Sequence, residues 1–201
     1  MKIYLILLIL SGNLLFSQDK KQAINDFLQT IVSDYNQEIF IVKEKTSINH
    51  VIDIFKGKTY KDSVTNLYTR DEREEIKKPL YNEDDWIKMK NEYYTKSGKM
   101  NSKIENFWKS NDFNYNKVSF ISIHLFIEFI INHSEQHLPI TPIFSFSEPI
   151  YYRCKNYLVF KVAEGNTESI NSLTDNYLII MKKENDKWIV FNKSYQLDIF
   201  Y

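Results

Sequence analysis

The sequence predicts an α+β fold, in which N-terminal and central helices pack on a C-terminal antiparallel β-meander. The first observation behind this prediction is an amphipathic helical pattern at residues 20–36. The second is a polar central region, 60–116, that contains short helical patterns. The third is a series of four apolar, aromatic or β-branched runs, separated by turn residues, in the C-terminal third. Helices followed by a run of strands are typical of α+β proteins.

Residues 1–17 have the layout of a secretory signal peptide. Lys2 supplies the positive charge, residues 3–10 form an apolar run, and the chain turns sharply polar after Ser17. The run is shorter than the ~20 residues that a membrane-spanning helix needs. We therefore expect cleavage after Ser17, a secreted or periplasmic location, no stable membrane span in the mature protein, and a single domain over residues 18–201. An uncleaved anchor or a buried first helix is the alternative.

Composition excludes several classes of protein. Lys plus Arg and Asp plus Glu are equal at 26 each, so the chain has no electrostatic footprint for nucleic acid. Apolar residues make up 43% and aromatic residues 15%, which is enough for a substantial core. Cys154 is the only cysteine, so no internal disulfide forms, and we expect it in a strand as a small, partly buried residue. A catalytic thiol would need a basic partner that the sequence does not place.

The first third of the chain predicts a helix, a strand and an ambiguous segment. A strand is expected at residues 38–45, which are rich in β-branched and aromatic residues. Residues 48–58 fit either a short helix or a strand, ending at Gly57. The buried stripe of the helix at 20–36 is expected to contain Ala23, Ile24, Phe27, Leu28, Ile31 and Val32.

The polar centre predicts short helices that pack on the sheet. Residues 71–78 read as a solvated helix that stops before Pro79. A second helix is expected over 82–94, because Asn82 can cap it and acidic residues occupy its first turn. Its buried stripe would consist of Trp86, Met89 and Tyr93. Another short amphipathic piece is expected to begin with Ile104, Phe107 and Trp108.

Residues 118–137 predict a short strand and then an apolar helix. The strand is expected at 118–121, and the helix follows with Ser122 as its N-cap. Pro139 shows that this helix must end close by. The residues expected on one helical face are Ile123, Phe126, Ile127, Ile130 and Ile131.

The C-terminal third predicts the meander. Apolar runs at 142–153, 156–165, 175–185 and 187–195 read as strands, with a hairpin turn at 184–186. We expect three to five antiparallel strands, with one face covered by the helices.

This pattern resembles the end of a group of uncharacterised secreted bacterial proteins. The phrases are "FSFSEPIYY", "NYLVFKV" and "NYLIIMKKENDKWIV", within residues 142–193. In that group a phrase like S-x-P-x-F precedes an apolar strand, a loop and a closing hairpin of the type xxKKxxGKWxI. The signal peptide ending in Phe16-Ser17-Gln18 is similar to theirs as well. Many members have a loop rich in Gly and Cys where this chain has "AEGNTESINSLTDN". The resemblance implies a C-terminal β-meander and transfers no site residue.

His133 and His137 are the candidate metal ligands. Four residues apart on a helix, two imidazoles lie on one face and could share a zinc ion. Glu135 lies between them, however, and in a helix it points to the opposite side, so it could not act as general base over that metal. A zinc site needs three or four ligands, and the sequence offers two. The alternative is that both histidines lie at a helix C-terminus, where they interact well with the helix dipole.

The sequence contains no recognisable catalytic set, and we expect no cofactor. The favoured hypothesis is a secreted or periplasmic, non-catalytic binding domain whose partner is a protein, a peptide or a cell-envelope component. One alternative is a secreted hydrolase whose site is assembled from distant residues. Another is an immunity-type protein that acts by occluding its partner. A binding domain predicts an exposed apolar patch, whereas a hydrolase predicts a pocket with convergent polar groups.

Overall fold

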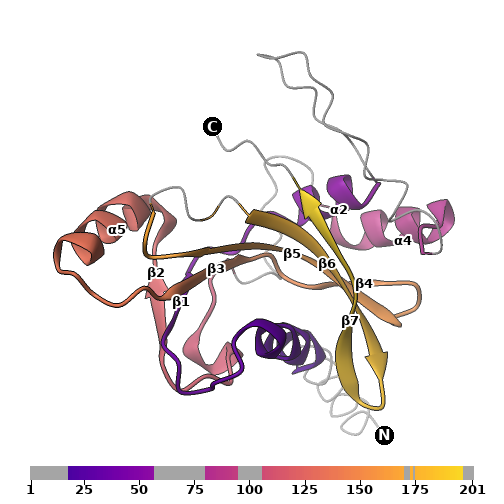
Figure 1. Ribbon diagram of the computed structural model, residues 1–201. Coiled ribbons are helices and arrows are strands. Elements are labelled where there is room, and N and C mark those ends of the chain that lie inside the picture. The colour runs from indigo at the N-terminus through magenta and orange to yellow at the C-terminus, as the bar shows by residue number, and fades with distance from the viewer. Residues whose placement is uncertain (1–17, 57–79, 95–105, 170–172, 174, 197–201) are drawn as a thin grey trace, which may run out of the picture.

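The computed structural model describes residues 18–56, 80–94, 106–169, 173 and 175–196 (Figure 1). The expected signal peptide, the helix expected at 71–78 and the start of the piece expected from Ile104 lie outside these ranges.

In the described part of the chain, the strands form one seven-stranded mixed sheet in the order β2-β1-β3-β5-β6-β7, and β4 pairs with β5. Strand β1 runs parallel to both β2 and β3, and the remaining pairs are antiparallel. The C-terminal antiparallel sheet is confirmed, and its five strands, β3 to β7, agree with the expected three to five, but the parallel pairing of β1 with β2 and β3 was not predicted. The strands are β1 (Ile39–Val42), β2 (Val118–Ile121), β3 (Pro142–Phe146), β4 (Ile150–Tyr152), β5 (Tyr157–Asn166), β6 (Asp175–Glu184) and β7 (Lys187–Gln196).

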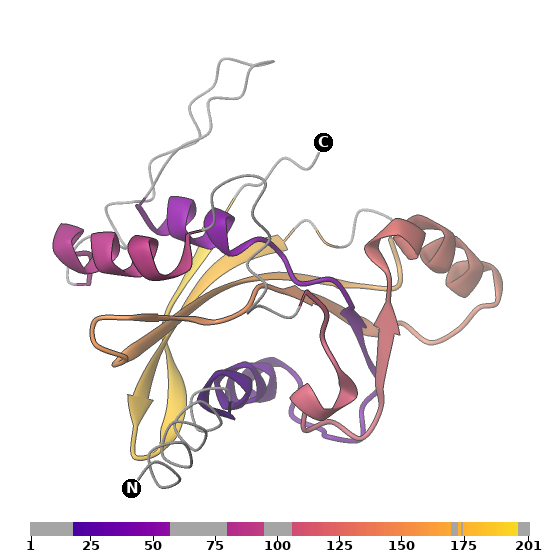
Figure 2. The same cartoon turned by 180° about the vertical axis from the view of Figure 1, so that it is seen from behind.

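Helices cover both faces of the sheet, so the expectation of one covered face was wrong (Figures 1 and 2). A helix at residues 18–31 lies under one face. The opposite face carries α2 (Ile48–Lys56), α4 (Glu83–Tyr93) and α5 (Phe126–Glu135). The described part of the ambiguous segment at 48–58, residues 48–56, is therefore a helix, and Gly57 lies outside the described residues. Two short 3₁₀ helices complete the fold, η1 (Ser110–Asp112) and η2 (Ile123–Leu125).

The first face of the sheet is closed by the helix at 18–31. Phe27 packs edge-on against Phe160 and Phe146, with ring centroids 5.5 Å and 6.4 Å apart. Such edge-to-face pairs add to the stabilisation from burial. The helix is shorter than predicted, and Ile31 at its end is 41% exposed instead of buried. Just beyond it, the hydroxyl of Tyr115 donates a 2.6 Å hydrogen bond to the carbonyl of Val32.

On the second face, α2 and α4 pack over the antiparallel half of the sheet. The amide of Asp85 donates to the side chain of Asn82 at 3.1 Å, so the predicted N-cap is confirmed. Trp86 and Met89 are buried as expected, and the Trp86 indole N–H donates to the carbonyl of Ile52. Tyr93 is only partly buried.

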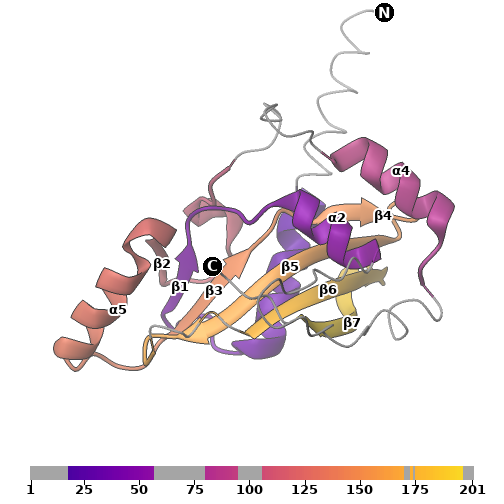
Figure 3. The ribbon, with the colours of Figure 1, turned by 90° about the horizontal axis from the view of Figure 1, so that it is seen from above.

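The same face has a third packing region at the parallel end of the sheet. Seen from above, α5 lies beside β2 and β1, at the opposite end of the molecule from α4 (Figure 3). This arrangement follows from the alternation of side chains along a strand, which turns Phe40 and Val42 to the α5 side while Ile39 and Ile41 face the other way. The residues of this region are Phe40, Val42, Ile121, Phe126, Ile130 and Ile143.

Two turns between strands can be compared with the sequence predictions. The hairpin between β6 and β7 turns at Asn185 and Asp186, with φ values of 49° and 63°, as predicted. Cys154 is exposed in the turn between β4 and β5, so its expected place in a strand was wrong.

The piece expected around Phe107 and Trp108 was also wrong: it is not helical, and Phe107 forms an isolated β-bridge with Glu44. The bridge pairs this segment with the chain that follows β1.

Candidate functional site

A concentrated apolar surface surrounds α5. Thirteen large hydrophobic side chains are exposed in the described part of the chain, and six of them fall within residues 123–140. Ile127 is 60% exposed and Ile140 63% exposed. We call this set the apolar face of α5: Ile123, Leu125, Ile127, Ile131, Leu138 and Ile140. A concentration of exposed apolar side chains in one segment is typical of an interaction site, whereas scattered single residues are not.

The sequence prediction for this helix was partly wrong. It placed five apolar residues on one buried face, but only Phe126 and Ile130 of that set are buried. Phe126, Ile130 and His133 follow the spacing i, i+4, i+7 and point to the sheet, whereas Ile127 and Ile131 lie about 100° further round the helix. α5 therefore carries apolar residues on the side that faces the sheet and also on a side that faces solvent.

Glu44, in the chain after β1, anchors the start of this segment. Its carboxylate accepts hydrogen bonds from the amide of Ile123 at 2.9 Å and from the hydroxyl of Ser122 at 2.8 Å. Ser122 occupies the predicted N-cap position, at the start of η2, but its side chain makes no capping hydrogen bond. Burial raises the pKa of the Glu44 carboxyl, but the two hydrogen bonds, a third from its own backbone and the nearby His124 together outweigh burial, and the net pKa is lowered.

The end of α5 is closed by a Schellman motif. The amide of Leu138 donates to the carbonyl of His133 at 3.3 Å, and the amide of His137 donates to the carbonyl of Ser134 at 3.0 Å. His137 occupies the left-handed position of this motif, with φ of 51°, where glycine is usual. It lies outside the helix and is exposed to solvent.

His133 belongs to the core beneath α5. It is 8% exposed, and its ring packs against Phe40 and Phe129, with centroids 6.0 Å and 5.6 Å away. Its Nε2 lies 2.9 Å from the carbonyl oxygen of Pro139. Because that carbonyl can only accept, Nε2 carries the hydrogen and has no lone pair for a metal.

The same carbonyl ties α5 to the sheet. The Thr141 hydroxyl donates to Pro139 at 3.0 Å. The Thr141 amide donates to the Thr167 hydroxyl at 2.9 Å, and the Thr167 amide donates back to the carbonyl of Thr141 at 3.0 Å. Through Pro139, Thr141 and Thr167, the end of α5 is fixed against the turn that follows β5.

The two candidate metal ligands do not converge. One is buried against aromatic rings, and the other is exposed in the turn beyond the helix. Within residues 18–56, 80–94, 106–169, 173 and 175–196, no group of three or more His, Cys, Asp or Glu side chains is arranged to hold a metal ion. The zinc hypothesis for His133 and His137 therefore has no geometric support.

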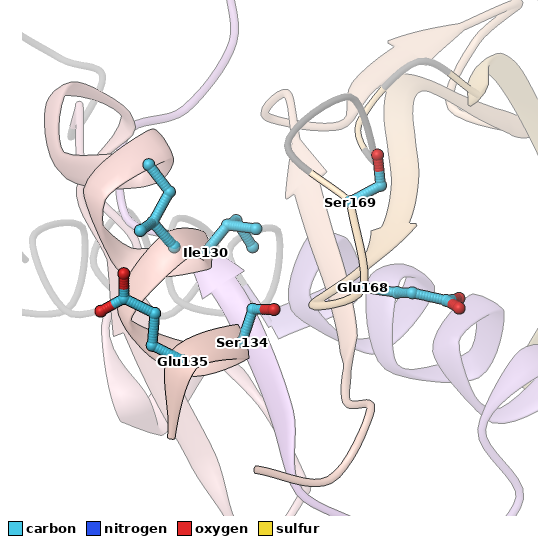
Figure 4. A pocket seen from close by; sticks show the side chains of 6 residues that line it. Ile130, Ser134, Glu135, Glu168 and Ser169 are labelled. Carbon is cyan, nitrogen blue, oxygen red and sulfur yellow. The ribbon is translucent and has the colours of Figure 1, made fainter. Parts of the chain in front are cut away.

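A pocket of about 350 Å³ lies between α5 and the segment 167–169 (Figure 4). Ile130 and Ser134 point from α5 into the gap, toward Ser169 on the other side. The carboxylates of Glu135 and Glu168 lie on opposite rims and point away from each other. The lining is therefore apolar and hydroxylic in the centre and acidic at both edges.

The segment that forms this surface carries acidic side chains and no basic ones. Residues 118–152 contain no Lys or Arg. In the described part of the chain, the carboxylates of Glu128, Glu135 and Glu168 form no ion pair. Acidic side chains therefore lie at both edges of the pocket, and Glu128 adds a third on α5.

Comparisons with protein-family models, curated proteins and solved structures found no match. The expected resemblance to secreted bacterial proteins thus stays a prediction. Among the helices in the described residues, we find none with the length and apolar character needed to cross a bilayer. The site is argued from its own geometry.

Sequence reasoning missed the outward role of Ile127 and Ile131 and the whole pocket. Two signals in the sequence point to them. One is that the segment 122–137 is apolar on more than one face, which a helix on one side of a sheet does not require. The other is the long stretch without basic residues.

Proposed function

We propose that this chain is an exported, non-catalytic binding domain that holds a partner protein or peptide on the apolar face of α5. The carrying observation is the concentration of exposed large hydrophobic side chains at residues 123–140. Apolar patches rimmed by polar residues mark binding surfaces, because burying them against a partner removes apolar area from water.

The rigidity of the segment supports the proposal. Glu44 fixes its start, and the hydrogen bonds at Pro139, Thr141 and Thr167 fix its end. A surface held at both ends loses little conformational entropy on binding, so more of the contact energy contributes to affinity.

A hydrolase remains the second candidate, but no specific observation favours it. The lining of the pocket supplies carboxylates and hydroxyls, and Ser134 has no imidazole among its pocket neighbours to activate it. The tyrosines with clearly raised pKa values, such as Tyr115, owe the shift first to burial in the core. Tyrosines whose pKa is shifted by burial indicate core packing, whereas a catalytic set requires several polar groups that converge in a pocket.

The proposal can be tested with a phage-displayed library of random peptides selected on the wild-type protein. The decisive variant is Ile127→Ser with Ile131→Ser, and the control is Ile31→Ser with Ile87→Ser, which removes two exposed isoleucines elsewhere. Selected peptides should bind the first variant about tenfold or more weakly and the control as they bind the wild type. Failure to select binders, or binders that tolerate the α5 variant, would overturn the proposal.

A further inference from the structure

We propose that the partner segment at this surface is basic: an apolar side chain enters the pocket beside α5, and Lys or Arg residues on both sides of it pair with Glu135 and Glu168. This inference rests on the proposed binding function and adds the chemistry of the partner. It follows from the lining of the pocket, the position of the carboxylates and the absence of Lys and Arg from residues 118–152.

The centre of the pocket suits an apolar anchor. Ile130 and Ile131 supply its α5 wall, and a volume of about 350 Å³ lies within the range of pockets that hold small ligands or single large side chains. Ser134 adds a hydroxyl group that can meet the backbone of a bound segment. An apolar centre with a polar rim is the usual arrangement of a binding interface.

The rim suits cations on either side of that anchor. The carboxylates of Glu135 and Glu168 point in opposite directions, so one cation cannot bridge them, but two can flank the pocket. Glu168 is held in place, because its amide donates to the side chain of Asn166 at 2.9 Å and the adjacent Thr167 is buried in the hydrogen bonds to Thr141.

Glu135 is unfavourable for the isolated fold. It is the last residue of α5, where the helix dipole is negative and a carboxylate is repelled. A cation from a partner would offset this repulsion, and the cation would itself be attracted to the negative end of the helix dipole. The position of Glu135 is therefore easier to explain by binding than by stability.

The same charges disfavour two other occupants. A second copy of this chain would bring the acidic rims together, since residues 118–152 offer no basic side chain to either copy. A membrane with anionic lipids would repel Glu128, Glu135 and Glu168. A basic, apolar segment of another protein has the complementary charge.

The test uses a short fluorescent peptide that alternates leucine with lysine, with two matched peptides in which glutamate replaces lysine or serine replaces leucine. Affinities are measured by anisotropy at low and high ionic strength. The decisive variant is Glu135→Gln with Glu168→Gln. The control, Glu38→Gln with Asp84→Asn, removes the same charge from exposed sites elsewhere. Urea unfolding of each variant confirms that it is folded.

We expect only the leucine–lysine peptide to bind. Its affinity should fall about tenfold in the decisive variant, stay unchanged in the control, and decrease with salt. Equal binding of the glutamate peptide, no binding of the lysine peptide, or no effect of the glutamine changes would overturn the inference. If one of these results is found but Ile127→Ser with Ile131→Ser still abolishes the binding of library peptides, the proposed binding function stands and only the basic character of the partner is rejected. Sedimentation with phosphatidylcholine–phosphatidylglycerol vesicles, lost in that isoleucine variant, would instead indicate a membrane surface.

Discussion

Replacing His133 with alanine should lower the free energy of unfolding by about 3 kcal/mol. The hydrogen bond from Nε2 to the Pro139 carbonyl spans 2.9 Å, and its loss costs about 1 kcal/mol. That part is small because Thr141 still donates to the same carbonyl. The ring also fills space beside Phe40 and Phe129. Its removal leaves a cavity that costs about 2 kcal/mol, less than for phenylalanine, because imidazole is smaller and more polar.

The matched control is the same change four residues later. His137 is exposed and already holds a left-handed φ of 51°, which alanine would share, so His137→Ala should change stability by no more than about 0.5 kcal/mol. His137→Gly should stabilise the protein by about 0.5 kcal/mol, since relief of the left-handed backbone exceeds the added entropy of the unfolded chain.

Urea unfolding measures all three variants, and a change in midpoint at constant slope reports stability directly. Zinc added to the wild type should leave the midpoint unchanged. Two results would refute the reasoning: equal destabilisation by His133→Ala and His137→Ala, or stabilisation by zinc that both substitutions abolish. Either result would mean that the two imidazoles act together.

Four further outcomes are expected. Glu44→Gln should cost about 1 kcal/mol at neutral pH, because the bond to Ile123 loses its charge. Since the folded pKa of Glu44 lies below 4.5, its stabilisation is present above that pH and is lost as the pH falls below it; urea midpoints of wild type and variant should converge in acid. Burial, and then the neighbouring Tyr35, raise the pKa of Tyr115 from 10.0 to about 12, so stability should fall as the pH rises through that interval, and Tyr115→Phe should reduce this dependence without abolishing it, because burial also raises the pKa of Tyr81, Tyr93 and Tyr151. The exposed thiol of Cys154 should react with a disulfide reagent as fast in the native protein as in urea. N-terminal sequencing of exported protein should begin at Gln18, and an intact Met1 would contradict the signal peptide.

Local signals in the sequence predicted local structure well. Asn82 and the acids that follow it predicted α4 and its cap, because both act within one helical turn. Asn185 and Asp186 predicted the β6–β7 turn, because both residues tolerate the left-handed backbone that a two-residue hairpin needs. In each case the interaction that decides the structure lies within a few residues.

Long-range pairing decided the rest. Nothing within β1 shows that it pairs in parallel with both β2 and β3, since those strands come much later in the chain. The orientation of α5 was equally hidden, because Ile127 and Ile130 are chemically alike and only the position of Phe40 and Ile143 determines which one is buried. The pocket depends on the contact between Thr141 and Thr167, which brings two distant segments together.

The parallel half of the sheet also has a kinetic consequence. Strands β5, β6 and β7 follow one another closely and can pair early, whereas β1 must wait for β2 and β3 from far along the chain. Because α5 packs on Phe40 of β1 and Ile143 of β3, it can dock on the sheet only after these strands have paired. We therefore expect the meander to be protected from hydrogen exchange before α5 during refolding, so that the apolar face of α5 is completed late in folding.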